Sequence, residues 1–280
     1  MNAFRMVVSA ATAALLSALL FNPAFAQKSS EFLPQIGQPG KDVIWVPTPD
    51  EIVERMLRMA QTTPNDYVID LGAGDGKIAI AAAKKFGARS LGIEYDSDMA
   101  KHAQANVVKA GAADRASILQ GDIFAVDFMS ATVLTMYLLP ALNLKLRPTI
   151  LSMKPGTRVV SHSFTMEDWE ADEVSSADGR RAYLWIVPAN VHGSWKLSVE
   201  GGESYDLSLD QRYQKVHGHV TLGSVRAGLR QVSLSGTSVN FTFVDNAGER
   251  RDFTGYVDGN LMQGTLRTGD RPEVRWSATK

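Results

Sequence analysis

Three glycines at alternate positions, Gly72, Gly74 and Gly76, follow directly after an apolar run that ends in Asp70. An alanine-rich helical pattern begins at Lys77. A loop of this kind between a strand and a helix lets backbone N–H groups approach a bound ligand closely. A dinucleotide fingerprint, G-x-G-x-x-G, would place its third glycine at the position of Lys77. The spacing therefore predicts a ligand site of a different kind.

A second acidic residue lies at a position from which it could bind the hydroxyls of a ribose. Glu94 ends the short strand pattern at 90–93, about 20 residues beyond Gly74. A carboxylate accepts hydrogen bonds from two adjacent hydroxyls at once, with charge-assisted strength. Glu94 is therefore the candidate for binding the ribose of a nucleoside ligand.

The order D-L-G-x-G-x-G, the acid Glu94 and the segment I-L-Q-G-D-I at 118–123 together resemble the class I methyltransferases that use S-adenosylmethionine (SAM). The resemblance implies SAM as the cofactor, with the acid Asp122 at the adenine edge. It assigns cofactor binding to Asp70, Gly72, Ala73, Gly74, Asp75, Gly76, Glu94, Tyr95, Asp122 and Ile123. The alternative is an ordinary glycine-rich turn in an α/β domain, which three signals in this order disfavour.

Three segments narrow the resemblance: V-P-T-P at 46–49, the glycine loop with its helix, and A-T-V-L-T-M-Y-L-L-P-A-L-N-L-K-L-R-P at 131–148. They are similar to a bacterial branch related to the mitochondrial protein-lysine methyltransferases that act on the ATP-synthase c-subunit and related carriers. The similarity covers residues 45–170 and omits the C-terminal part. It implies methyl transfer by in-line attack, but the acceptor does not follow from it, because related folds host many acceptors. A protein lysine is the expected acceptor, with a small molecule as the alternative.

The residues that follow the predicted fourth strand indicate which methyl acceptors are disfavoured. Methyltransferases that act on adenine N6 or glutamine have (D/N)-P-P-(Y/F) there, whereas this chain reads M-Y-L-L-P at 136–140, which argues against those acceptors. Tyr137 is the candidate catalytic residue, because the carboxyl end of this strand can line the acceptor channel. The alternative for Tyr137 is a core tyrosine with a satisfied hydroxyl. A lysine acceptor has to lose its proton before attack, and burial favours this by disfavouring the ammonium.

Composition excludes some functions. The chain of 280 residues has a formal net charge of −1, which offers no general attraction to nucleic acid. It has no cysteine, so the thiolate attack used to methylate carbon 5 of cytosine is absent. The acidic run at 167–173 could attract a cationic substrate, although a solvated loop is the favoured interpretation.

The N-terminus predicts export. Arg5 is followed by an apolar run at 6–21 and by A-F-A at 24–26, which predicts a signal peptide over residues 1–26 and a periplasmic or secreted protein. An uncleaved membrane anchor is the alternative. Because SAM is made in the cytosol, export also leaves open a second class of function, an exported nucleoside-binding or interaction protein with a methyltransferase-like domain.

The element pattern predicts an α/β domain after a linker. Residues 27–46 are polar and rich in glycine and proline, which indicates a linker. We expect Thr48 to be the N-cap of the first helix, in a capping box. Strands and helices alternate over 47–190, which predicts a parallel sheet with helices on both faces, the Rossmann-like architecture of the family. Residues 183–187 are the candidate for an antiparallel strand that ends this sheet.

The last part of the chain has a different pattern. Residues 191–280 contain about eight short strands of alternating polarity, which predicts an antiparallel, barrel-like β domain. His217 and His219 fall on one face of a predicted strand. A pair without a third ligand is more typical of surface residues than of a metal site, so no metal is expected.

Overall fold

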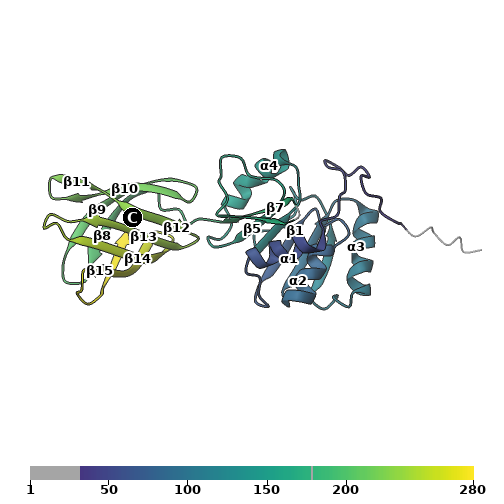
Figure 1. Cartoon of the computed structure of the whole chain (residues 1–280), viewed down its shortest axis with the longest axis horizontal. Helices are drawn as coiled ribbons and strands as arrows, with labels where there is room; N and C mark the ends of the chain where they lie inside the picture. The colour runs from purple at the N-terminus through teal and green to yellow at the C-terminus, as the bar shows by residue number, and fades with distance from the viewer. Residues whose placement is uncertain (1–31, 178) are drawn as a thin grey trace, which may run out of the picture. The chain divides into compact units, whose positions relative to one another are not determined.

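The computed structural model describes residues 32–177 and 179–280 and contains two β-sheets (Figure 1). The helices are α1 (Asp50–Met59), α2 (Lys77–Phe86), α3 (Ser97–Lys109) and α4 (Pro140–Leu151). The first sheet consists of β1 (Tyr67–Leu71), β2 (Arg89–Glu94), β3 (Ala116–Gln120), β4 (Val133–Met136), β5 (Arg158–His162), β6 (Glu173–Ala177) and β7 (Arg180–Ile186). No helix in the described ranges is long and apolar enough to cross a membrane.

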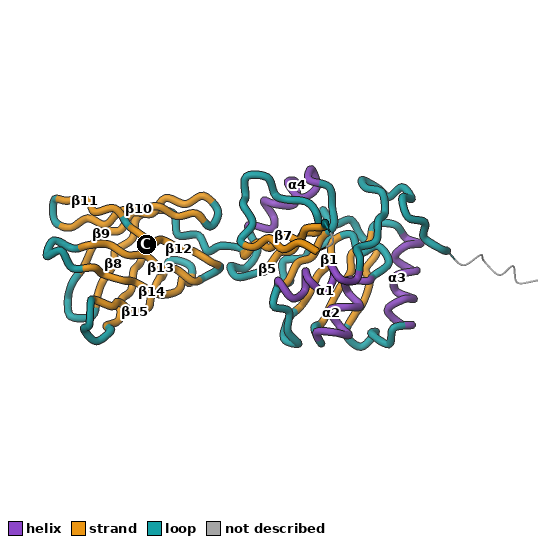
Figure 2. Tube along the Cα trace, viewed as in Figure 1, coloured by secondary structure: helices purple, strands orange, loops and turns teal. Residues whose placement is uncertain are grey.

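The first sheet has the strand order β3-β2-β1-β4-β5-β7-β6. β1 pairs in parallel with both β2 and β4, and β4 pairs in parallel with β5. Figure 2 labels β1, β5 and β7 of this sheet together with the helices α1 to α4. The chain adds β2 and β3 on one side of β1 and then returns to its other side, so a crevice opens between the carboxyl ends of β1 and β4. The predicted Rossmann-like sheet is confirmed.

An antiparallel strand follows the parallel ones, as residues 183–187 predicted. β7 pairs with β5 in antiparallel register, with Tyr183 opposite Ser161, and begins at Arg180. β6 extends the sheet beyond β7 and was not predicted. Its sequence, E-V-S-S-A, is short and polar and carries no strand signal of its own.

Alternate residues of the central strands supply a core on each face of the sheet. Val68 and Val133 pack with apolar residues of α1 and α2. Their chain neighbours Ile69 and Leu134 pack in a second cluster that includes Leu146 of α4. Helices therefore cover both faces, as predicted.

The first helix does not have the predicted cap. Its N-cap is Pro49, and no side chain caps it. The hydroxyl of Thr48 instead lies 3.3 Å from Nδ1 of His162. The prediction that Thr48 caps α1 is wrong because a buried imidazole, distant in sequence, takes the hydroxyl that the local pattern assigns to the helix.

The second sheet has nine strands rather than about eight: β8 (Gly193–Val199), β9 (Ser204–Arg212), β10 (Lys215–Leu222), β11 (Val225–Gly228), β12 (Arg230–Ser235), β13 (Ser238–Val244), β14 (Arg250–Asp258), β15 (Leu261–Thr268) and β16 (Val274–Thr279). Every pairing is antiparallel, and the sheet curls into a nearly closed barrel.

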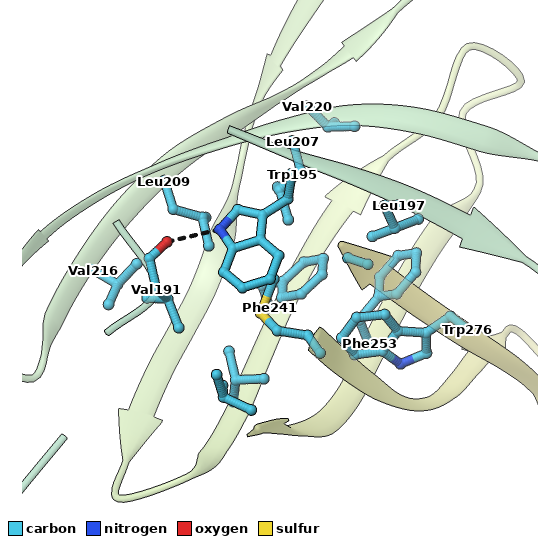
Figure 3. Packing of buried hydrophobic residues seen from close by; sticks show 14 of the residues in the cluster. Val191, Trp195, Leu197, Leu207, Leu209, Val216, Val220, Phe241, Phe253 and Trp276 are labelled. Atoms are coloured by element: carbon cyan, nitrogen blue, oxygen red, sulfur yellow. Dashed lines mark hydrogen bonds between the residues drawn. The ribbon is translucent and has the colours of Figure 1, made fainter. Parts of the chain in front are cut away.

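Aromatic side chains fill the interior of this barrel (Figure 3). The ring of Phe253 stacks on Phe241 at 4.8 Å and meets Trp276 edge-on at 5.6 Å. Nε1 of Trp195 donates to the carbonyl of Val191 at 2.8 Å. Within the described ranges, no group of three or more His, Cys, Asp or Glu could hold a metal ion.

Candidate active site

A cavity of about 750 Å³ opens at the carboxyl edge of the first sheet. Its walls include the segments after β1, β2, β3, β4 and β5 and residues 38–48 before α1. Ten of the eleven candidate residues line it: Asp70, Gly72, Ala73, Gly74, Asp75, Glu94, Tyr95, Asp122, Ile123 and Tyr137. The eleventh, Gly76, is the N-cap of α2, with a left-handed backbone. It supports the loop without lining the cavity.

The glycine loop lies close against a tryptophan. Gly74 has a φ of 54°, and a Cβ on it would lie 2.5 Å from Nε1 of Trp45. Trp45 belongs to the N-terminal hairpin, residues 37–45, where N of Gly37 donates to O of Trp45 at 2.8 Å and N of Trp45 donates to O of Gln38 at 2.9 Å. Part of the segment expected to be a linker is therefore a wall of the cavity.

Glu94 is held by backbone groups on both sides. Its Oε2 accepts from N of Gly74 at 2.8 Å, and its Oε1 accepts from N of Asp96 at 3.0 Å. Burial raises the pKa of the Glu94 carboxyl, and the backbone N–H groups offset part of this effect. Each carboxylate oxygen keeps a second lone pair, so the fixed side chain can also accept from two ribose hydroxyls.

We expect Glu94→Ala to weaken SAM binding, because two hydrogen bonds to a charged acceptor are worth at most about 1.5–3 kcal/mol each. Isothermal titration with SAM measures the change. Asp98→Ala is a matched control, because this acid stands on the neighbouring helix, pairs with Lys101 and does not line the cavity. A change below about threefold in the dissociation constant of Glu94→Ala would mean that another residue binds the ribose.

Asp70 brings a buried acid to the same cavity. It is 2 % exposed, and its Oδ1 accepts from Oγ1 of Thr135 at 2.7 Å. Burial raises the pKa of Asp70 to about 7; the hydroxyl of Thr135 opposes this effect, and the charges of Asp75 and Glu94 add to it. Asp70, Asp75 and Glu94 around one cavity suit a ligand that carries positive charge.

Asp122, Ile123 and Tyr95 also line the cavity. Oδ1 of Asp122 accepts from N of Phe124 at 3.0 Å, and its Oδ2 pairs with Nζ of Lys41 at 2.7 Å. Lys41 comes from the N-terminal hairpin and lies 4.5 Å from the ring centre of Tyr95. The hydrogen bond from Lys41 lowers the pKa of the Asp122 carboxyl.

Aromatic and aliphatic side chains form the remaining wall, which includes Tyr137, Leu139 and Phe164. The ring centre of Tyr137 lies 4.0 Å from that of His162 and 6.1 Å from that of Phe164. Burial lowers the pKa of His162 to about 4, so this imidazole is neutral at pH 7. Tyr137, Leu139 and Phe164 bring neither a carboxylate nor an amide to this wall.

Sequence reasoning missed several residues of the site. Lys41, Trp45, Thr48 and Phe164 all line the cavity. The segment V-P-T-P was noticed only as part of the family resemblance and as a helix start. The position of Phe164 just after β5, at the edge where parallel strands end, is the signal that could have indicated it.

The acidic run at 167–173 is engaged in ion pairs. Asp168 accepts from Arg212, Arg147 and Tyr213, whose hydrogen bonds lower its pKa to about 2. Glu170 pairs with Lys215. These contacts favour a structural role over the attraction of a cationic substrate.

The residues fit SAM. Asp70 and Asp75 match its sulfonium and ammonium charges, Glu94 matches its ribose, and Asp122 matches an adenine edge. A Cβ on Gly74 would lie 2.5 Å from Nε1 of Trp45, so this position of the loop admits no larger side chain. The fold and the site together define a class I SAM-dependent methyltransferase.

Comparison with known proteins agrees with this class. The ANTKMT methyltransferase domain matches residues 70–173. The chain is 42 % identical over 151 residues to a protein-lysine N-methyltransferase of Saccharolobus islandicus, an alignment that covers 52 % of this chain and 94 % of that protein. It is 26 % identical over 183 residues to the ATP synthase c-subunit lysine N-methyltransferase of Mus musculus, covering 59 % of this chain and 73 % of that protein.

A solved structure with high similarity is an RNA methyltransferase from Salinibacter ruber in complex with S-adenosylhomocysteine. It is 46 % identical with a TM-score of 0.51, and the alignment covers 52 % of this chain and 96 % of that chain. The chain belongs to the methyltransferase family of the Saccharolobus protein-lysine N-methyltransferase, and it is a SAM-dependent methyltransferase.

None of the described residues of the barrel lines the cavity, so we predict that a protein ending at Asn190 folds and binds SAM with unchanged affinity. The loss of Tyr213, whose ring stacks on Trp169 at 5.8 Å, should lower the melting temperature without changing the dissociation constant. A protein ending at Asp172 is the contrast, because it lacks β7 and exposes the edge of β5, which favours aggregation. If the longer protein fails to fold or loses SAM, the barrel is integral to the catalytic domain.

Proposed function

We propose that this enzyme transfers the methyl group of SAM to a lysine side chain of a protein. The observation that carries the proposal is the 42 % identity to the Saccharolobus protein-lysine N-methyltransferase over 94 % of that protein. The mouse relative is also named as a lysine N-methyltransferase.

The wall formed by Tyr137, Leu139 and Phe164 supports a lysine acceptor. SAM supplies a methyl group that is already activated by its positive sulfur, so the protein has to align the amine and exclude water. An apolar wall disfavours the ammonium form of lysine and so favours the neutral amine, whose lone pair can attack. Aromatic rings also accept the alkyl stem of a lysine and its positive charge before deprotonation.

The similarity to an RNA methyltransferase raises RNA as a second candidate acceptor. The charge around the cavity argues against it, because six acids and two lysines stand among the lining residues. The acids are Asp42, Asp70, Asp75, Glu94, Asp96 and Asp122, and the lysines are Lys41 and Lys77. A negative field of this kind repels a phosphate backbone.

Transfer of a radioactive methyl group from SAM tests the proposal. A panel of lysine-containing peptides is compared with the same peptides after acetylation of their lysines, and with mixed RNA oligonucleotides. We expect label on the free-lysine peptides only, with a mass increase of one methyl group. Label on RNA, or label that survives acetylation, would contradict a lysine acceptor.

We also propose that the chain is exported and cut between Ala26 and Gln27. The support is the charged start, the apolar run and the A-F-A pattern, which lie outside the described residues. Export would bring the enzyme to envelope proteins as acceptors and would require a supply of SAM there. N-terminal sequencing of the protein from its native host decides the matter, and an intact Met1 on a cytosolic species would refute export.

A further inference from the structure

Three side chains from separate segments form a chain of contacts that ends in the cavity wall of Tyr137, Leu139 and Phe164. Thr48 precedes α1, His162 ends β5 and Tyr137 follows β4. Oγ1 of Thr48 lies 3.3 Å from Nδ1 of His162, and the ring centres of His162 and Tyr137 are 4.0 Å apart. Thr48 and Tyr137 line the cavity, whereas His162 does not. His162 can therefore act on a substrate only through its neighbours.

The second ring neighbour of Tyr137 is also fixed. Phe164 stacks on Tyr137 with an angle of 22° between the rings. The fully buried Asn143 of α4 donates from Nδ2 to O of Thr165 at 3.1 Å and to O of Phe164 at 3.4 Å. The position of Tyr137 is thus defined from β5 by His162 and from α4 through Phe164.

A residue that only filled space would not need to be a histidine. His162 is 1 % exposed, and its Nε2 has no hydrogen-bond partner among the described residues. Buried polar atoms nearly always have partners, and an exception calls for an explanation. A phenylalanine would fill the position without an unpaired nitrogen, but it could not bond to Thr48.

We propose that His162 is a positioning residue for methyl transfer, which Thr48 orients and which holds the ring of Tyr137 at the acceptor amine. The inference rests on the proposed function, because the acceptor is a lysine amine. In-line attack tolerates little misplacement, since the reacting atoms have to lie about 3–3.5 Å apart on one axis. A ring that turns away from His162 would leave the amine poorly aligned without changing how SAM binds.

The Thr48 variants test the first link. Thr48→Val removes the hydroxyl and keeps the shape, and we expect kcat on the best lysine peptide to fall about three- to tenfold. The Michaelis constant for the peptide and the dissociation constant for SAM should stay within about twofold. Thr48→Ser should restore kcat. Thr62→Val, the same change at a buried threonine that lies outside the cavity, should leave kcat unchanged.

A double-mutant cycle tests the second link. His162→Ala should lower kcat about tenfold or more in the wild-type background and have almost no effect in a Tyr137→Leu background, because the histidine acts through that ring. An equal loss in both backgrounds would overturn the proposal. So would an unchanged kcat in Thr48→Val, or a loss of SAM affinity in step with kcat.

Failure of the positioning role can be told apart from failure of the proposed function. If wild-type enzyme labels no lysine peptide, the lysine acceptor is wrong. If it labels the peptide and the Thr48 and His162 variants label it equally well, only the positioning role is wrong. Should His162→Ala fail to fold, the comparison of kcat between Thr48→Val and Thr48→Ser still tests whether His162 positions Tyr137.

Discussion

Gly74→Val should abolish SAM binding, with a rise of about 100-fold or more in the dissociation constant measured by equilibrium dialysis. Two causes act together. The φ of 54° is a left-handed conformation that β-branched side chains avoid, and the first added carbon would lie 2.5 Å from Nε1 of Trp45. The displaced loop would also move N of Gly74 away from Oε2 of Glu94, a contact of 2.8 Å.

Gly223→Val is a control that separates the effect of backbone strain from the effect of the contact with Trp45. Gly223 has a φ of 67° in the turn between β10 and β11, and no described atom lies within 4 Å of the position of its Cβ. This variant should lose stability through its backbone but bind SAM like the wild type. Circular dichroism checks that both variants fold. A Gly74→Val protein that folds and binds SAM normally would refute the assignment of the glycine loop.

The central part of the site could be predicted because its determinants are local. The strand, the turn and the helix that place Gly74 are adjacent in sequence, and Glu94 ends the very next strand. Parallel pairing of β1 with β2 then brings the two together, since both strands end at the same edge of the sheet.

The remainder depends on contacts between distant segments, which no local pattern encodes. Lys41 meets Asp122 across 81 residues, and Thr48 meets His162 across 114. The segment before residue 47 looks like a linker because it is polar and rich in glycine and proline, yet N of Gly37 donates to O of Trp45 and N of Trp45 donates to O of Gln38. The capping prediction for Thr48 failed for the same reason, since a tertiary partner took the hydroxyl.

Ion pairs between distant segments could not be predicted from the sequence either. The acidic run at 167–173 looks like a solvated loop in the sequence, yet Asp168 is bonded to Arg147 of α4 and to Arg212 of β9. Charge patterning alone cannot distinguish a free acid from a paired one. The sequence therefore predicted the fold class, the cofactor-binding loop and the place of Tyr137, and the structure was needed to bring Trp45 and Phe164 to the same cavity.

Asp70→Asn should stabilise the SAM-free protein at pH 8. The folded-state pKa of about 7 lies above the ordinary value of 3.8, so the folded protein bears the cost of a buried charge that the unfolded chain does not. That cost is absent below about pH 4, grows between pH 4 and pH 7, and is complete above pH 7. Its upper limit is about 4 kcal/mol, at about 1.4 kcal/mol for each pH unit between the two pKa values.

Denaturant unfolding at pH 5 and pH 8 measures this effect. The free energy of unfolding of Asp70→Asn should exceed that of the wild type by more at pH 8 than at pH 5. Asp66→Asn is a control of opposite sign. Asp66 is also buried, but hydrogen bonds from Arg158 and Thr132 outweigh that burial and lower its pKa, so its loss should destabilise the protein at pH 8. An Asp70→Asn protein that is less stable than wild type at both pH values would refute the buried-charge argument.

SAM binding should depend on pH through the same carboxyl. At pH 6 only about a tenth of the Asp70 side chains would be ionised, so the wild-type affinity for the cationic cofactor should rise about tenfold between pH 6 and pH 8. Titration in buffers of different ionisation enthalpy should show that binding releases a proton near pH 6.5. Asp70→Asn should bind SAM more weakly at pH 8, and its affinity should change much less with pH. Any pH dependence that comes from the ionisation of SAM itself is the same for both proteins, so it cancels when the two pH profiles are compared. Equal slopes in the two proteins would show that another group senses the charge of SAM.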